Sequence, residues 1–211
     1  FFKPMPLEMI EEIKEKQFGI RDNKVVFFWN NRNARRKMTG SLVHWFNEFA
    51  EEVGPENVRL IMHTDPKDPN GQDIEMILSA LNALDGRILI SRDKVAPEQL
   101  ATFYNIADCT INISDAEGFG LATLESLSCE TPIIVNMTGG LQEQVTDGEE
   151  WFGIGIEPAS KAIIGSQQVP YIYEDRISKE DFIAALKNIY NMTPGERKLL
   201  GMKGRQHVVK N

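Results

Sequence analysis

Short apolar segments alternate with amphipathic segments along most of the chain. The apolar segments are rich in β-branched and aromatic residues, as expected of strands that are buried on both faces of a parallel sheet. They lie at residues 25–29, 58–63, 87–90, 109–113, 133–135 and 151–156. Between them, apolar residues recur at the three-and-four spacing of helices. The alternation predicts an α/β fold, a Rossmann-like doubly wound parallel sheet with right-handed crossovers.

The amphipathic segments predict helices that cover this sheet. We expect them between Pro6 and Gly19, over residues 39–53, from Ile74 to Gly86, after Pro97, after Gly120, over residues 141–145, after Ser178 and after Pro194. The third of these helices carries Ile74, Ile77, Leu78, Leu81 and Leu84. The last one places Leu199, Leu200 and Met202 toward the core.

Residues 158–175 interrupt the alternation. Gly, Ser, Gln and Pro surround two short apolar groups, Ile163-Ile164 and Tyr171-Ile172-Tyr173. Because these residue types favour turns, the segment predicts a loop or flap.

Composition narrows the class of protein. The 211 residues are 42% hydrophobic and 26% charged, which is ordinary for a globular domain. A net charge of −8 and a pI near 5.0 argue against binding to a nucleic-acid backbone. Cys109 and Cys129 are the only cysteines, which favours a reducing compartment over a disulfide framework. The sequence has no apolar run of transmembrane length and does not begin with Met, so we expect it to be part of a longer protein.

The chain between residues 114 and 132 carries the clearest chemistry. Gly118 and Gly120 permit a sharp turn between the strand at 109–113 and the next helix. The first N–H groups of a helix in this position favour an anion, commonly a phosphate. Glu117 precedes the turn, and Glu125 follows it with seven residues between them. Two acids on either side of a phosphate site could each hold hydroxyl groups. A sugar nucleotide has this layout, with hydroxyl groups on both sides of its phosphates.

These motifs resemble the donor-binding half of retaining glycosyltransferases of family 4, the glycosyl transferases group 1, which have the GT-B fold. The matching runs are Glu117-Gly118-Phe119-Gly120-Leu121 with Glu125, Thr131-Pro132-Ile133-Ile134-Val135, Gly139-Gly140-Leu141-Gln142-Glu143 and Asp147-Gly148. Two spaced acids alone are a weak signal, but these runs occur together and in register. The resemblance covers about residues 20–192.

By this resemblance, an Arg and a Lys after the first strand clamp the donor diphosphate, and Arg32 and Lys37 occupy the matching positions. The adjacent Arg36 could substitute. A Lys point charge and an Arg fork suit a pyrophosphate whose charge grows as it leaves. A solvated basic loop is the alternative reading. The family usually has Gly at positions 31 and 130, where this chain has Asn and Glu, so we expect a different backbone approach at Asn31 and a local distortion at Glu130.

The same resemblance implies that Glu125 holds the ribose hydroxyls and that Glu117 contacts the donor sugar near the transferred carbon. The remaining donor-binding positions that it implies are Gly118, Phe119, Gly120, Leu121 and Thr123. The alternative is a pair of solvent-facing acids near a helix start, where acids are stabilising in any case.

Other functions on the same fold class fit less well. A nicotinamide or flavin dehydrogenase should carry a glycine fingerprint after its first strand. That position holds Asn30-Asn31-Arg32-Asn33, which excludes the fingerprint. A non-catalytic nucleotide-sugar-binding module and a sugar-nucleotide epimerase stay as alternatives. The three histidines do not cluster, and no Cys/His spacing fits a metal site, so we expect no metal and no other cofactor.

We therefore predict a lead-in or interdomain segment over residues 1–24, a nucleotide-sugar-binding Rossmann-like domain over 25–192 and a C-terminal helix over 193–211. Joined to a missing N-terminal acceptor domain, the chain would be a retaining hexosyltransferase. It would move a hexosyl group from a nucleotide diphosphate sugar, with UDP or GDP as the nucleotide, to an unidentified acceptor hydroxyl. The fragment alone would be inactive. The expected location is cytoplasmic, and peripheral attachment of the full-length protein to a membrane is left open.

Overall fold

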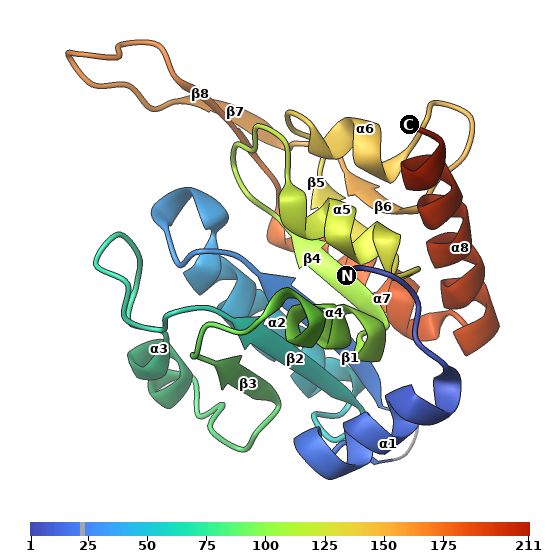
Figure 1. The fold of residues 1–211 in the computed structure, drawn as a ribbon. Helices are drawn as coiled ribbons and strands as arrows, with labels where there is room; N and C mark the ends of the chain where they lie inside the picture. The colour runs from blue at the N-terminus through green and yellow to red at the C-terminus, as the bar shows by residue number, and fades with distance from the viewer. Residues whose placement is uncertain (22–23) are drawn as a thin grey trace.

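The computed structural model describes residues 1–21 and 24–211, and its centre is a six-stranded sheet (Figure 1). The strand order is β3-β2-β1-β4-β5-β6, and every pairing in the sheet is parallel. The strands are β1 (Val25–Asn30), β2 (Val58–His63), β3 (Ile88–Ser91), β4 (Cys109–Asn112), β5 (Ile133–Asn136) and β6 (Gly153–Ile156). The predicted doubly wound parallel sheet is therefore confirmed.

Helices cover both faces of the sheet. They are α1 (Leu7–Phe18), α2 (Thr39–Val53), α3 (Ile74–Ala80), α4 (Pro97–Ile106), α5 (Leu121–Ser128), α6 (Leu141–Val145), α7 (Lys179–Asn191) and α8 (Pro194–Lys210), with a short 3₁₀ helix, η1 (Arg35–Lys37). Side chains alternate along β1, because successive residues of a strand point to opposite faces. Phe27 and Trp29 pack under α2, α3 and α7. Val26 and Phe28 pack under α1 and α4, and α5, α6 and α8 continue that layer over β5.

The strand order reverses between β1 and β4. These two strands are neighbours through Phe27 with Cys109 and Phe28 with Thr110. The chain leaves β1 toward β2 on one side and leaves β4 toward β5 on the other. At such a switch point the loops after the two strands diverge and leave a crevice at the carboxyl ends.

Residues 158–175 form a hairpin with a long loop at its tip, so the segment expected to be a loop or flap also contains two short strands. Strands β7 (Ser160–Ile163) and β8 (Tyr173–Arg176) pair antiparallel and project from the body of the domain (Figure 1). Polar contacts fasten the base: Asp175 donates its N–H to the carbonyl of Asp115 at 2.8 Å, and its own carbonyl accepts from Asn136 Nδ2 at 2.7 Å. Ile163, Val169 and the side chains around Tyr171 near the tip are exposed.

The extent of one predicted helix and the buried face of another differ from the structure. Helix α3 ends at Ala80, and Asn82 has a φ of 53°, which stops the helix before Leu84. The prediction that this helix continues to Gly86 was therefore wrong, and Leu84 lies beyond the helix with 68% of its surface exposed. Leu199 and Met202 are also exposed. Helix α8 instead buries Arg197, Gly201 and Gly204, because the glycines let its backbone approach the end of α5.

The distortion expected at position 130 is present. Glu130 ends the helical region after α5 with a φ of 61°, a left-handed conformation that glycine adopts more easily. Its carboxylate pairs with Lys198 at 2.5 Å. None of the helices in the described part of the chain is long and apolar enough to cross a membrane.

Candidate functional site

A pocket of about 400 Å³ lies at the carboxyl ends of β1 and β4, where the strand order reverses. Its lining comes from four segments: the end of β1 with η1, the first turn of α4, the end of β4 with the following turn, and the first turns of α5. The lining residues are Asn30, Asn31, Lys37, Leu100, Asn112, Glu117, Phe119, Gly120, Leu121, Ala122 and Glu125. The structure therefore brings together most of the site residues predicted after the first strand and around the glycine turn.

The amino end of α5 opens into this pocket. Gly120 is the N-cap with a φ of 85°, and no side chain caps the first turn. The first N–H groups of the helix are thus left to a ligand or solvent, and together with the helix dipole they favour an anion. The backbone of Gly139, in the loop after β5, packs closely against this turn. A Cβ at Gly139 would meet the carbonyl oxygen of Glu117, so the loop after β5 fits closely only because position 139 lacks a side chain.

Lys37 and Glu117 form an ion pair at the pocket wall. Lys37 Nζ contacts Glu117 Oε2, and Arg36 Nη1 lies 3.6 Å from the same oxygen. Burial raises the pKa of Glu117, but the hydrogen bond and charge of Lys37 outweigh burial and leave the pKa below its ordinary value. Burial lowers the pKa of Lys37, and its pairing with Glu117 opposes that shift. A buried cation and a carboxylate thus stand beside the anion-favouring helix end.

Glu125, in the second turn of α5, also lines the pocket. Its Oε2 accepts a hydrogen bond from the hydroxyl of Tyr104 at 2.7 Å, and that hydroxyl accepts from Asn30 Nδ2 at 2.8 Å. Burial raises the pKa of Glu125, while the hydrogen bond from Tyr104 lowers it. The sequence pattern places Tyr104 in the helix core and gives no sign of this polar contact.

The basic segment after β1 divides between separate partners. Arg32 is 64% exposed, and its guanidinium pairs with Asp68, with Nε 2.7 Å from Oδ2. Arg35 forms a two-point contact with the buried carboxylate of Glu174 on β8. Arg36 donates to the carbonyl of Ala116 at 2.7 Å. In this arrangement Lys37 lines the pocket, whereas Arg32 faces Asp68 beside it.

Three further polar side chains, Thr123, Asn31 and Asn112, lie at or beside the pocket. Thr123 is fully buried and donates to the carbonyl of Gly120 at 2.8 Å, so its hydroxyl supports the turn from inside the helix. Asn31 Nδ2 and Asn112 Nδ2 are buried, line the pocket and have no hydrogen-bond partner among residues 1–21 and 24–211. Sequence reasoning did not select Asn112 as a site residue. Its signal was a polar residue at the end of an otherwise apolar strand.

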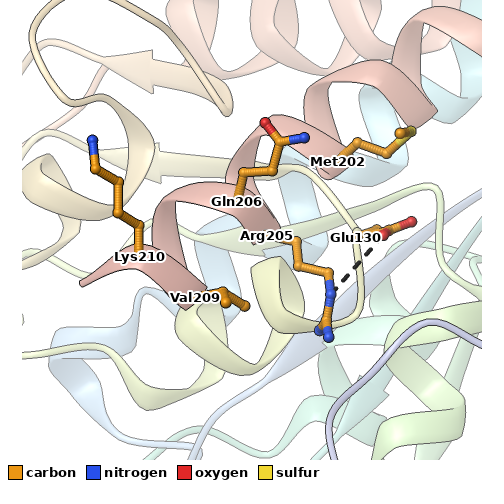
Figure 2. Close-up of a pocket in the computed structure, with 6 residues that line it drawn as sticks. All are labelled: Glu130, Met202, Arg205, Gln206, Val209 and Lys210. Carbon is orange, nitrogen blue, oxygen red and sulfur yellow. Dashed lines mark ion pairs between the residues drawn. The ribbon is translucent and has the colours of Figure 1, made fainter.

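A second, shallow pocket lies on the outer surface of α8 (Figure 2). It has a volume of about 370 Å³ and is lined by Glu130, Met202, Arg205, Gln206, Val209 and Lys210. Glu130 Oε1 and Arg205 Nε lie 4.0 Å apart at its edge. None of the predicted donor-site residues is among them. No cluster of three or more His, Cys, Asp or Glu side chains that could hold a metal occurs within the described residues.

Comparison with known protein sequences identifies the family of this chain. The family described as Glycosyl transferases group 1 matches residues 11–189. The alpha-monoglucosyldiacylglycerol synthase of Acholeplasma laidlawii is 29% identical over 142 residues, which are 67% of this chain and 34% of that protein.

Solved structures show the same fold. A sucrose-phosphate synthase from Thermosynechococcus elongatus superposes with a TM-score of 0.73 at 23% identity, over 99% of this chain and 45% of that one. The Anabaena protein HepE, solved in complex with UDP and glucose, superposes with a TM-score of 0.73 at 14% identity, over 99% and 49% of the two chains. The chain thus spans less than half the length of these relatives. Its fold corresponds to one half of the GT-B architecture.

Proposed function

Because the chain belongs to the glycosyl transferases group 1 family, we propose that the pocket between β1 and β4 binds a nucleotide diphosphate sugar. Joined to an acceptor-binding half, the chain would transfer a hexosyl group to an acceptor hydroxyl with retention of configuration. The residues matching an acceptor half would precede Phe1, and the reaction would take place in the cleft between the halves. Residues 1–211 alone would therefore bind the donor and turn over little of it.

One observation supports this proposal most directly. Lys37 comes from the segment after β1, Glu117 from the turn after β4 and Glu125 from α5, and the three side chains line one pocket beside the uncapped start of α5. A diphosphate next to that helix end would be stabilised by the helix dipole and by the cation of Lys37. In the proposed complex the two carboxylates would accept hydrogen bonds from hydroxyl groups on either side of that diphosphate.

Each side chain then has a specific task in the proposed reaction. Lys37 stabilises the charge that grows on the leaving diphosphate, and Glu117 lies near the transferred sugar. Glu125 accepts hydrogen bonds from the ribose. Arg32 assists Lys37 once its guanidinium has left Asp68. No metal takes part in this scheme, and a cytoplasmic location belongs to the proposal because Cys109 and Cys129 are both free and buried.

Calorimetric titration of residues 1–211 with UDP, GDP and ADP, each with and without chelator, tests the proposal. We expect selective binding of one nucleotide that survives chelation and is weakened at least about tenfold in Lys37→Met, since a charge-assisted contact is lost. Lys203→Met removes a half-buried lysine on α8 that pairs with Glu150 and does not line the pocket, and it should leave the affinity unchanged. Absence of binding to all three nucleotides would contradict the proposed function, and binding that requires a divalent ion would contradict the metal-free scheme.

A further inference from the structure

The hydroxyl of Tyr104 links two residues that line the pocket, Asn30 and Glu125. It donates to Glu125 Oε2 at 2.7 Å and accepts from Asn30 Nδ2 at 2.8 Å. Asn30 ends β1, Tyr104 lies in α4 and Glu125 lies in α5, so three elements meet in one chain of hydrogen bonds. Asn30 and Glu125 line the pocket, whereas Tyr104 is completely buried behind it.

The surroundings fix the position of this hydroxyl. The Tyr104 ring meets Phe28 edge to face with centroids 5.0 Å apart, and Phe2 packs on it at 5.8 Å. Its backbone carbonyl accepts a hydrogen bond from Thr131 Oγ1 at 2.7 Å. A phenol held in this way cannot follow Glu125 if that side chain rotates. The hydrogen bond therefore selects one orientation of the carboxylate, and the entropy cost of ordering it is met before a ligand arrives.

The direction of the hydrogen bonds is also determined. Burial raises the pKa of Tyr104, and the nearby carboxylate of Glu125 raises it further, so the phenol keeps its proton. Asn30 donates its amide N–H to the hydroxyl, and the phenolic proton then points to Glu125 Oε2, which as a carboxylate oxygen can only accept. The other oxygen, Glu125 Oε1, accepts no hydrogen bond from the described residues. It is the oxygen that stays available to a ligand hydroxyl.

We propose that Tyr104 is a positioning residue that holds Glu125 in the orientation in which its carboxylate distinguishes a ribose from a deoxyribose nucleotide. This inference rests on the proposed function, because it concerns the nucleotide part of the same donor. A carboxylate held in place can accept from a ribose hydroxyl at once, and a deoxyribose leaves it buried without that donor. Without the hydroxyl of Tyr104, Glu125 is free to turn toward solvent, and the discrimination weakens.

Tyr104→Phe tests the inference, because it removes the hydroxyl and keeps the ring. Calorimetry would compare the nucleoside diphosphate that the parent chain binds with its 2′-deoxy and 3′-deoxy forms. We expect the parent to prefer the ribose form about tenfold, as for a hydrogen bond to a charged group, and Tyr104→Phe to retain about twofold. Tyr190→Phe is the matched control, since Tyr190 lies on α7 at the other face of the sheet and should keep the full preference.

A pH profile separates positioning from a merely structural role. The Tyr104 hydrogen bond lowers the pKa of Glu125, so removing it raises that pKa. The ribose preference of Tyr104→Phe should consequently be lost at a higher pH than that of the parent when the solution is acidified. Taking the ratio of ribose to deoxyribose affinity at each pH cancels the titration of the diphosphate itself. If Tyr104→Phe fails to fold, Asn30→Ala, which removes the other end of the chain of hydrogen bonds, should reduce the same ratio.

The outcomes separate the two proposals. Nucleotide binding with an unchanged ribose preference and an unchanged pH profile in Tyr104→Phe would overturn the positioning role and leave the donor site standing. A parent chain that binds ribose and deoxyribose forms equally would overturn the role of Glu125 and, with it, that of Tyr104. A parent chain that binds none of UDP, GDP or ADP would overturn the proposed function and this inference together.

Discussion

Lys37, in the segment after β1, pairs with Glu117, in the segment after β4, across the crevice between the two strands. The side chains are only 8% and 10% exposed. Each of these charges would be costly to bury alone, and the pair keeps both ionised at the pocket wall. The pair thus joins the two loops that diverge at the switch point, and it presents a cation to any anion at the start of α5.

Glu117→Gln should destabilise the domain by about 2 kcal/mol at pH 7, because it leaves Lys37 buried without its counter-charge. The pKa of Glu117 lies below its ordinary value of 4.5, since pairing with Lys37 outweighs burial. The contribution of the pair is therefore complete above about pH 5 and is lost as the pH falls through the lowered pKa. Urea unfolding at pH 7 and at acid pH measures the difference, which should shrink on acidification.

The matched change Glu149→Gln removes an exposed carboxylate from the turn between α6 and β6 and should alter stability little at either pH. A Glu117→Gln variant as stable as the parent at pH 7 would show that the ion pair contributes nothing to the fold.

Asp68→Asn should strengthen nucleoside diphosphate binding about threefold. Asp68 holds the guanidinium of Arg32 beside the pocket, and Arg32 can assist a diphosphate only after leaving this exposed pair. Removing the competing carboxylate raises the fraction of chains in which Arg32 is available. Calorimetry checks the change, with Asp65→Asn in the same loop as control because Asp65 bonds the N–H of Lys67 instead. Equal affinity in Asp68→Asn and the parent would remove Arg32 from the donor site.

Asp115→Asn should change how stability depends on pH. Burial and the neighbouring carboxylate of Glu174 raise the pKa of Asp115 to about 6, although Arg176 and Arg35 oppose the shift. The folded parent therefore takes up a proton that the unfolded chain, with a pKa of 3.8, does not. Its stability falls by about 2 kcal/mol as the pH rises from 4 through 6, since each pKa unit corresponds to about 1.4 kcal/mol. The variant should lack this decline.

Chemical unfolding at several pH values between 4 and 7.5 measures how the free energy of unfolding changes with pH. An unpartnered amide in the variant lowers this free energy equally at every pH and so does not alter its pH dependence. The exposed Asp93→Asn should keep the decline of the parent. If Asp115→Asn and the parent lose stability in parallel across this range, Asp115 does not titrate near pH 6 in the folded chain.

Gly139→Ala should destabilise the domain by about 2–4 kcal/mol. Gly139 has a φ of 51°, and an added Cβ would meet the carbonyl oxygen of Glu117, so both backbone strain and a clash arise. Gly118→Ala lies in the neighbouring loop, where a Cβ would meet nothing within 4 Å, and should stay within about 0.5 kcal/mol of the parent. Thermal unfolding of the two variants compares them directly. Similar midpoints would show that the loop after β5 adjusts without cost.

Periodicity predicted the sheet well because its signal is local. The apolar run at 58–63 coincides with β2, and the runs at 25–29, 109–113 and 133–135 differ from β1, β4 and β5 by a single residue each. The cap at Ser178 also holds, since its hydroxyl accepts from the N–H of Asp181 at 3.0 Å. Such features depend on neighbours within a few positions of the chain.

The failures come from contacts that sequence spacing does not encode. Leu199 and Met202 satisfy helical spacing, but the glycines of α8 turn the opposite face toward α5. The partner of Arg32 lies 36 residues away and could not be read from a basic run. The sequence pattern indicated that Tyr104 is an apolar core residue. Its hydroxyl finds its hydrogen-bond partners, Asn30 and Glu125, only when α4, β1 and α5 pack together. The hairpin of β7 and β8 was hidden because its apolar groups are short and separated by turn-forming residues.

The hairpin of β7 and β8 also provides a site at which this domain can be labelled. Its base is fastened by Arg35, Asp115 and Asn136, whereas the turn at residues 165–168 is exposed and distant from those fastenings in the sequence. A peptide tag or fluorescent label inserted at this turn would extend outward from the body and leave the hydrogen bonds of the base undisturbed. Since Glu174 contacts Arg35, two residues before Lys37, such a label would sit on an arm attached directly to the loop that lines the pocket.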